Sequence, residues 1–433
     1  MRTSLVPGDL AAVDERLAAT DELLAAAYPG DDGSRQAVHT VYVPADRYTP
    51  ELPALWGRAA LVAVDAAGGL EALGVAVGLD EGLAAEVAPL VRRKLEHEPI
   101  EDLRIDFEDG YGDRGDAIED TEAIRAAKRV IAAGGAGFAP PFLGIRFKSF
   151  EAATRARGIR TLDLFVTALL EHGSLPEGLA LTLPKVSTVA QVQAMADVAA
   201  ALERSLGLPR GRPRFEVQVE TPQLILGADG ISPVARLALA APGRISGIHY
   251  GTYDYSAALG VAPRQQSMDH PAADFAKQVM QVAVAGTGIR LSDGSTNILP
   301  VGDGTAAAWR LHARLVHRSL ERGFAQGWDL HAHQLPTRFL ATYAFYREGY
   351  PEASARLRHR RRGTAVPGGA GASAGGADVP GGVLDEPATV RALAGFVLRG
   401  LRCGAIPAVE VAAGTGLDEA ELIALAHPRR ATA

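Results

Sequence analysis

The stretch FEVQVETPQLILGADGI, residues 215–231, decides how we interpret the fold of this sequence. It begins with a short apolar run typical of a strand, and the run ends in an acidic residue, Glu220. A second stretch, ISGIHYGTYDYSAALG at 245–260, has the same form and delivers Asp254. Because parallel strands end at the same edge of a sheet, we expect the two carboxylates to face a shared space in which a divalent cation fits.

Eight strand-like runs alternate with helical segments between about residue 38 and residue 340. This alternation predicts an α/β fold, a (β/α)8 TIM barrel. A doubly wound open sheet is the alternative, but YVPADRYTP stands where a glycine-rich phosphate loop would follow the first strand. The helix predicted at 188–206 follows a Ser-Thr pair suited to capping and stops at Gly207. The predicted strands are residues 38–44, 103–109, 142–147, 179–186, 215–220, 245–251, 288–293 and 328–333.

The sequence divides into four predicted segments. The tract GTAVPGGAGASAGGADVPGG at 363–382 is nearly all small residues and proline, which indicates a flexible linker or mobile loop. Residues 406–422 have the rhythm of a helix-turn-helix, but the second helix is acidic and phosphate would repel it, so we favour structural packing. The segments are an N-terminal helical extension (1–37), the catalytic barrel (38–350), the linker (351–382) and a C-terminal helical segment (383–433).

Composition narrows the function classes. The chain has 433 residues, 47% of them hydrophobic, and a formal net charge of −7, so we expect no nucleic-acid partner despite the basic run at 356–362. A single cysteine, Cys403, excludes an intrachain disulfide and fits a reducing compartment. Met1–Leu10 lacks an apolar signal core, and charges and glycines interrupt Leu61–Leu79. We therefore expect a soluble cytoplasmic protein without membrane association.

Charged side chains gather at the predicted C-terminal ends of the strands, where barrel enzymes place their reacting groups. Such a density of opposed charge is costly unless a cation or an anionic ligand completes it. Arg146 could clamp a carboxylate through two parallel hydrogen bonds; the alternative is an ion pair with the acidic residues at 106–109. The residues expected at this end are Asp106, Glu108, Asp109, Arg146, Lys185, Glu220, Asp254, Asp293, His331 and His333.

Glu220 and Asp254 suit Mg²⁺, which takes one or two carboxylates and keeps other positions for water or substrate oxygens. Each carboxylate alone could instead stabilise a helix N-terminus, but together with Arg146 they favour a metal site. The sequence HAH at 331–333 would place two imidazoles on one face of a strand. Zinc is disfavoured there because no third soft ligand lies nearby.

Six motifs follow one another along the chain: YVPADR, IDFEDGYGD, TLPKVST, VQVETPQLILGADGI, HYGTYDYSAALG and GWDLHAHQLP. Together they resemble the HpcH/HpaI aldolase and citrate lyase β-subunit family and, more distantly, the malate synthases. The likeness runs from about Val38 to Arg347. Phe147, Lys148 and Ala332 depart from the family pattern. Strand two ends in Glu-Asp, as in the citrate lyase and malate synthase branches, whereas the HpcH-type aldolases use His.

The resemblance implies roles for particular residues. Glu220 and Asp254 would hold Mg²⁺, and Arg146 would bind and polarise the substrate. The adjacent residues Glu108 and Asp109 would act as the base, bind a water molecule or pair with Arg146. Lys185 would contribute charge near the substrate, because this chemistry needs no covalent lysine intermediate.

The resemblance also implies a reaction. We expect a Mg²⁺-dependent carbon–carbon lyase acting on a small oxo- or hydroxy-acid, or on its coenzyme A (CoA) thioester, through an enolate-like charge that the metal and Arg146 stabilise. Two alternatives remain: a malyl- or citramalyl-CoA lyase or thioesterase, and an inactive barrel that binds an anionic metabolite. The resemblance further implies a homo-oligomer, a trimer or hexamer, in which the C-terminal helices pack over a neighbouring subunit.

Overall fold

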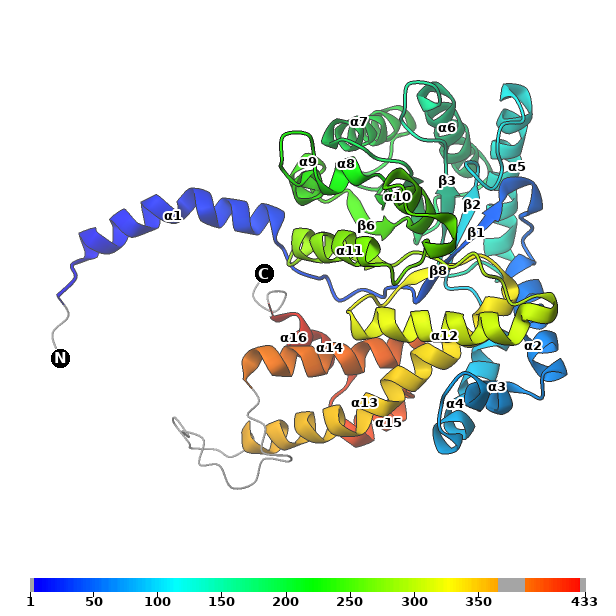
Figure 1. The fold of residues 1–433 in the computed structure, drawn as a ribbon. Helices are drawn as coiled ribbons and strands as arrows, with labels where there is room; N and C mark the ends of the chain where they lie inside the picture. The colour runs from blue at the N-terminus through cyan, green and yellow to red at the C-terminus, as the bar shows by residue number, and fades with distance from the viewer. Residues whose placement is uncertain (1–3, 365–385, 429–433) are drawn as a thin grey trace.

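The computed structural model describes residues 4–364 and 386–428, and a barrel of eight parallel strands forms its centre (Figure 1). The strands pair in the order β7-β6-β5-β4-β3-β2-β1-β8. A parallel bridge between Ser292 of β7 and Gln326, just before β8, connects the two ends of this order. The predicted fold is confirmed, with one strand in each predicted run. The strands are β1 (His39–Pro44), β2 (Asp102–Asp106), β3 (Phe142–Arg146), β4 (Leu179–Leu183), β5 (Phe215–Val219), β6 (Ile245–Tyr250), β7 (Arg290–Ser292) and β8 (Gly327–Asp329).

Side chains alternate along each strand between the helical layer and the inside of the barrel. In β2, Leu103 and Ile105 are buried in the hydrophobic core, whereas Asp102, Arg104 and Asp106 are buried polar residues. In β5 the same alternation separates the apolar residues 215, 217 and 219 from the polar residues 216 and 218. The inside of this barrel is therefore polar along these strands, and the C-terminal end of that polar column is where the predicted site lies.

Helices surround the barrel and extend it at both ends of the chain (Figure 1). Helix α7 begins after Thr188 and ends at Gly207, which adopts the left-handed φ of +65° expected of a glycine stop. The helices are α1 (Pro7–Ala27), α2 (Leu52–Ala66), α3 (Leu70–Ala76), α4 (Glu81–His97), α5 (Asp116–Gly135), α6 (Arg155–His172), α7 (Val189–Leu206), α8 (Pro222–Ile225), α9 (Leu237–Ala240), α10 (Thr252–Ala258), α11 (Pro271–Val284), α12 (Thr305–Glu321), α13 (Leu335–Thr364), α14 (Pro387–Cys403), α15 (Ala408–Thr415) and α16 (Glu419–Ala426).

The two ends of the chain behave differently. Helix α1 stands away from the barrel, and every residue in it except Ala27 is exposed (Figure 1).

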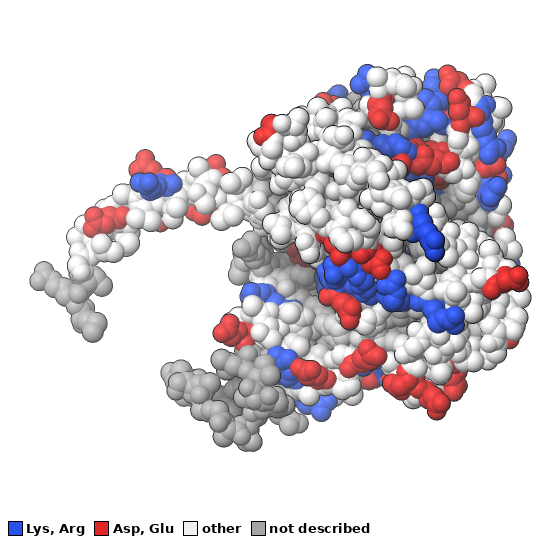
Figure 2. Space-filling model, in the orientation of Figure 1, with Lys and Arg blue, Asp and Glu red and all other residues white. Residues whose placement is uncertain are grey.

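On the face drawn in Figure 2, basic and acidic side chains are interspersed. Within the described residues, no single helix is long and apolar enough to cross a membrane, although the bent pair α2 and α3 passes that test of length and composition.

The C-terminal helices pack on their own chain. Helix α14 lies along α13 (Figure 1), and Val397 and Leu398 of α14 join the same hydrophobic core as the barrel. The expected reach of these helices over a neighbouring subunit stays a prediction. The predicted linker begins too early, because α13 continues to Thr364, with Leu357 buried in the core. The remainder of the predicted linker, residues 365–382, lies outside the described residues.

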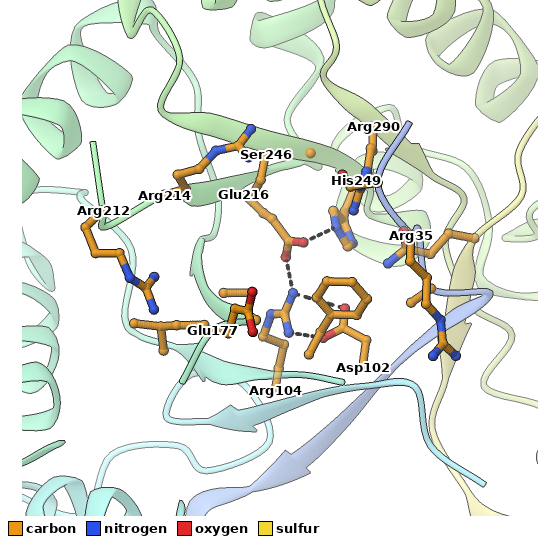
Figure 3. Close-up of a pocket in the computed structure, with 18 residues that line it drawn as sticks. Arg35, Asp102, Arg104, Glu177, Arg212, Arg214, Glu216, Ser246, His249 and Arg290 are labelled. Carbon is orange, nitrogen blue, oxygen red and sulfur yellow. Dashed lines mark hydrogen bonds and ion pairs between the residues drawn. The ribbon is translucent and has the colours of Figure 1, made fainter. Parts of the chain in front are cut away.

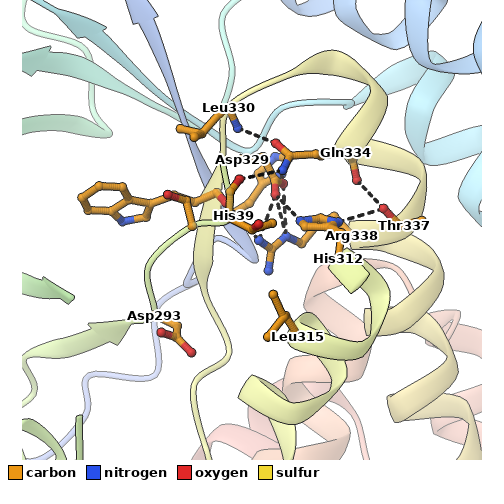
Figure 4. Close-up of polar contacts among 12 residues, drawn as sticks. His39, Asp293, His312, Leu315, Asp329, Leu330, Gln334, Thr337 and Arg338 are labelled. Atoms are coloured by element: carbon orange, nitrogen blue, oxygen red, sulfur yellow. Dashed lines mark hydrogen bonds and ion pairs between the residues drawn. The ribbon is translucent and has the colours of Figure 1, made fainter. Parts of the chain in front are cut away.

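The predicted strand at 328–333 ends early, at Asp329, because this carboxylate is held in a buried network (Figure 4). Asp329 accepts hydrogen bonds from Arg338, and its two oxygens lie 2.7 Å from Nδ1 of His39 and 3.0 Å from Nε2 of His312. Every member of this network is buried, so it joins β1, β8, α12 and α13 as a structural contact. The chain then turns into a 3-10 helix, Ala332–Gln334.

Candidate active site

Arg146, the last residue of β3, makes a buried two-pronged ion pair. Its Nε and Nη2 each lie 2.7 Å from an oxygen of Asp106 at the end of β2. Asp106 also accepts hydrogen bonds from the main-chain N–H groups of Glu108 and Gly110, so its carboxylate is fully engaged. The structure thus realises the ion-pair alternative for Arg146. The fork that could have clamped a substrate carboxylate is occupied, and Nη1, 3.2 Å from Glu108, remains for other contacts.

Lys185 brings three carboxylates together. Its Nζ donates a hydrogen bond to Glu108 and another, of 2.8 Å, to Asp109, and it lies 3.6 Å from Asp254. Lys185 is the only residue other than glycine with a left-handed φ, +51°, in the part of the chain that the structure describes. Such a conformation costs roughly 1–3 kcal/mol and is typical of functional sites. It also directs the main-chain N–H of Lys185 to Glu220 Oε1, at 2.7 Å.

Glu220 follows β5 and is almost completely buried. Burial raises the pKa of its carboxyl group to about 8, with the negative charges of Glu108 and Asp254 adding to the effect against Arg146 and Lys185. The main chain leaves room for this carboxylate only because residue 251 is glycine. A Cβ atom there would lie 2.4 Å from Cβ of Glu220 and 2.6 Å from its Oε2.

The adjacent carboxyl groups of Glu108 and Asp109 have opposite shifts. Burial raises the pKa of Glu108, and the charge of Asp109 raises it further, despite Arg146 and Lys185. Burial acts in the same direction on Asp109, but the hydrogen bond from Lys185 and the charge of Arg146 outweigh it and hold the pKa of Asp109 below its usual value. The pair therefore shares its proton unequally, and Glu108 keeps it to higher pH.

A pocket of about 280 Å³ opens at this end of the barrel and unites most of the predicted residues. Arg146, Glu220, Asp254 and Asp109 line it, while Glu108 and Lys185 reach its edge through their contacts with Asp109 and Asp254. Asp254 differs from the prediction in one respect, because it lies in the first turn of α10 and not at the end of β6. Its side chain is 48% exposed.

Three predicted residues do not contribute to this pocket. Asp293 is buried, and its Oδ2 is bonded to Nζ of Lys277 in α11 at 2.9 Å and to the hydroxyl of Ser319 in α12 at 2.6 Å. His331 and His333 lie in the turn after β8, where Nδ1 of His331 accepts the main-chain N–H of His333. Because residues 331–333 are not a strand, the two imidazoles do not share a strand face, contrary to the expectation.

The donor set fits Mg²⁺ better than other metals. Within residues 4–364 and 386–428, no three His, Cys, Asp or Glu side chains are grouped so as to hold an ion by themselves. Mg²⁺ needs only one or two carboxylates, and Glu220 and Asp254 supply two on the wall of one pocket. Two further observations fit a cation at this place: burial and the nearby carboxylates raise the pKa of Glu220, and Glu108 Oε2, which is ion-paired with Arg146, is buried without a hydrogen bond.

The sequence interpretation missed two aromatic walls of the pocket, Tyr42 and Trp328. Their rings pack with centroids 4.8 Å apart, and the guanidinium carbon of Arg146 lies 4.7 Å from the centre of the Tyr42 ring. This contact stabilises the Arg146 guanidinium in addition to its bonds with Asp106. The sequence could have indicated Tyr42, because it lies in the first predicted strand, on the same face as Pro44 at the end of that strand.

Comparison with known proteins identifies a family and a fold. A family model described as a domain of unknown function (DUF6986) matches residues 17–430. None of the curated proteins matches the sequence. A solved structure of a citrate lyase from Burkholderia xenovorans LB400 is similar, with 18% sequence identity and a TM-score of 0.57, over 90% of this chain and 100% of that chain.

Two further solved structures align less well. A malate synthase from Haloferax volcanii has 16% identity and a TM-score of 0.48, over 72% of this chain and 76% of that chain. The protein CitE from Mycobacterium tuberculosis, in complex with magnesium and acetoacetate, has 17% identity and a TM-score of 0.40, over 70% and 89%. At these identities the citrate lyase establishes only the shared fold. Membership of the HpcH/HpaI family is not confirmed, because the matching family model is a different one.

Proposed function

This chain belongs to the family described as a domain of unknown function (DUF6986), and we propose that it is a Mg²⁺-dependent carbon–carbon lyase for a small oxo- or hydroxy-acid or its CoA thioester. One observation carries the proposal: Glu220 and Asp254 line a single pocket beside Arg146 at the C-terminal end of the barrel. The solved structure that shares the fold is named a citrate lyase, and the proposal places this chain in the same reaction class.

Glu220 and Asp254 are the residues that would hold Mg²⁺. When bound, Mg²⁺ supplies positive charge that stabilises the negative charge developing on the substrate as a carbon–carbon bond beside a carbonyl breaks. Gly251 fixes the position of the Glu220 carboxylate by leaving it no competing side chain. The main-chain N–H of Lys185 fixes one oxygen of Glu220 from the other side.

The remaining side chains bind the substrate and move a proton. Arg146 presents Nη1 to the pocket in an orientation set by Asp106 and Tyr42. The Glu108–Asp109 pair receives the proton of a substrate hydroxyl as it becomes a carbonyl, with Glu108 holding it because its pKa is raised by burial. Lys185 compensates the charge of that pair and lies close enough to the pocket to contact an anionic substrate.

The dimensions and charge of the pocket support this substrate class. A volume of about 280 Å³ is small, since pockets for drug-sized ligands occupy roughly 300–1,000 Å³. It accommodates a short acid, and a thioester substrate would have to place its CoA portion outside. A malyl- or citramalyl-CoA lyase or thioesterase would use the same metal ligands with a different electrophile.

A second candidate function is an anion-binding barrel without turnover. One observation favours it: the fork of Arg146 is bonded to Asp106, so a substrate carboxylate meets only one of its nitrogen atoms. The nearby Lys185 would then be the main cation for a bound acid.

A substrate panel separates these functions. Short hydroxy-acids, 2-oxo acids and their CoA thioesters are incubated with the full chain and Mg²⁺, and the release of pyruvate, glyoxylate and thiol is followed with and without EDTA. Mg²⁺-dependent release of an oxo-acid supports the lyase, and release of thiol without carbon–carbon cleavage supports the thioesterase. Binding of an acid, seen as a rise in melting temperature, without turnover of any panel member supports the second candidate.

A further inference from the structure

A second pocket, of about 220 Å³, lies at the opposite end of the barrel (Figure 3). Its lining includes the first residue of four strands, namely Asp102, Phe142, Leu179 and Arg290. Because all eight strands are parallel, strand beginnings and strand ends lie at opposite faces of the barrel. The pocket is therefore separated by the length of the barrel from Glu220 and the candidate active site.

The charges on the floor of this pocket are paired within the chain. Arg104 is completely buried and lies between Asp102 and Glu216, as Figure 3 shows. Burial raises the pKa of Asp102, and Glu216 also lies 3.3 Å from Nε2 of His249. Two carboxyl groups share one guanidinium, so the floor has no excess of positive charge and a bound anion would have to be held by the walls.

The walls, in contrast, carry three arginines with little carboxylate compensation. Among the described residues, Arg212 and Arg214 form no ion pair. Arg212 donates hydrogen bonds to main-chain carbonyls of the loop before β4, and Arg214 donates one to a main-chain carbonyl of β6. Arg290 donates a hydrogen bond of 2.5 Å to the hydroxyl of Ser34, and its nearest carboxylate oxygen, on Asp32, lies 3.9 Å away.

Burial has the largest effect on the charge of Arg290. It lowers the pKa of Arg290, and the positive charge of Arg214 acts in the same direction, against the negative charges of Asp32, Asp31 and Glu216, which raise it. The acidic side chain on the pocket wall outside the floor, Glu177, is exposed to solvent and forms no ion pair within the described part of the chain.

We propose that this pocket binds a small dianionic oxyanion, a phosphate group, held by Arg214 and Arg290 with Arg212 at the rim. Guanidinium groups recognise phosphate through parallel charged hydrogen bonds, and three of them face a space too small for a drug-sized ligand. The bound group would supply the negative charge that Arg214 and Arg290 lack. The phosphate could be inorganic or part of a small phosphorylated metabolite, and the two sources share this chemistry.

Titration of the full chain with inorganic phosphate tests the proposal, with calorimetry and melting temperature as readouts and NaCl holding the ionic strength constant. We expect saturable binding that Arg214→Gln and Arg290→Gln each weaken by at least about tenfold, because each removes charged hydrogen bonds. Glu177→Gln should tighten binding, since it removes a wall carboxylate that forms no ion pair with the described residues. Arg58→Gln, a change at an exposed arginine of α2, is the matched control and should have no effect.

Glycerol 3-phosphate is titrated in parallel to distinguish the two sources. Tighter binding of the ester than of inorganic phosphate assigns the site to a phosphorylated metabolite, and the reverse order assigns it to phosphate itself. The proposal is overturned if neither ligand binds saturably below about 10 mM, or if Arg58→Gln weakens binding as much as Arg214→Gln. Arg214 is exposed, so its variant decides the outcome even if Arg290→Gln fails to fold.

Discussion

Replacing Glu220 by Gln should make the metal-free protein more stable at alkaline pH. The pKa of this buried carboxyl is about 8, against an ordinary value of 4.5 that holds in the unfolded chain. Between these two values the folded state binds the proton that the unfolded state has released, so stability falls as pH rises. Glutamine cannot ionise, and its side-chain oxygen can still accept the main-chain N–H of Lys185.

The magnitude follows from the two pKa values. Each pH unit between about 5 and 8 should lower the free energy of unfolding of the wild-type chain by about 1.4 kcal/mol relative to Glu220→Gln. The difference should reach about 4–5 kcal/mol above pH 8 and vanish near pH 4.5. Mg²⁺ should narrow this difference, because only the wild-type carboxylate can bind it, and a concentration of 100 times Kd stabilises the wild type by about 2.7 kcal/mol.

Urea unfolding in EDTA at half-unit steps from pH 5 to pH 9, repeated with Mg²⁺ at pH 8, measures both effects. Glu171→Gln changes an exposed glutamate of α6 in the same way and serves as the control. Parallel pH profiles for the wild type and Glu220→Gln would refute the assigned burial and charge environment. Equal stabilisation of both by Mg²⁺ would remove Glu220 from the metal site.

Three further changes probe other parts of the site. Asp254→Asn should weaken Mg²⁺ binding by at least about tenfold in calorimetry while changing unfolding free energy by no more than about 0.5 kcal/mol, since its side chain is 48% exposed; unaltered Mg²⁺ binding would contradict its role. Arg146→Met should cost about 3–5 kcal/mol in urea unfolding because Asp106 is left buried without its partner, and a loss of activity at full stability would restore the substrate-clamp interpretation. Gly251→Ala should push the Glu220 carboxylate aside, lowering Mg²⁺ affinity at a stability cost of about 1–3 kcal/mol; a variant with normal Mg²⁺ affinity would show that this contact does not position the carboxylate.

The fold could be predicted because each strand is short, apolar and separated from the next by a helix with its own start and stop signals. Helix α7 illustrates this, since Thr188 and Gly207 mark its ends in the sequence and in the structure. Boundaries failed where a tertiary contact overrides the local pattern. The run WDLHAH reads as a strand, but Asp329 is drawn into a buried network with His312 and Arg338, and the chain turns immediately afterwards.

The membership of the site could be predicted more fully than its internal pairing. Residues at strand ends converge because parallel strands share an edge, which places Glu220 and Arg146 in one pocket. Which carboxylate pairs with which cation depends on rotamers and depths that no spacing rule encodes. The sequence places several acidic residues near Arg146. Only the structure shows that Nε and Nη2 of Arg146 bind Asp106, while Lys185 forms an ion pair with Glu108.

The alternation of side chains within the strands explains why both ends of this barrel carry charge. Asp102, Arg104 and Asp106 share the inward face of β2, so the strand that supplies the floor of one pocket also supplies the carboxylate that orients Arg146 in the other. Likewise, Glu216 of β5 lines the pocket at one end of the barrel, and Glu220, directly after β5, lines the pocket at the other end. A barrel that keeps its inside polar must pair each charge or leave it for a ligand. The floor charges are paired within the chain. The raised pKa of Glu220 shows that its charged form is disfavoured by burial, and a bound cation would stabilise that form.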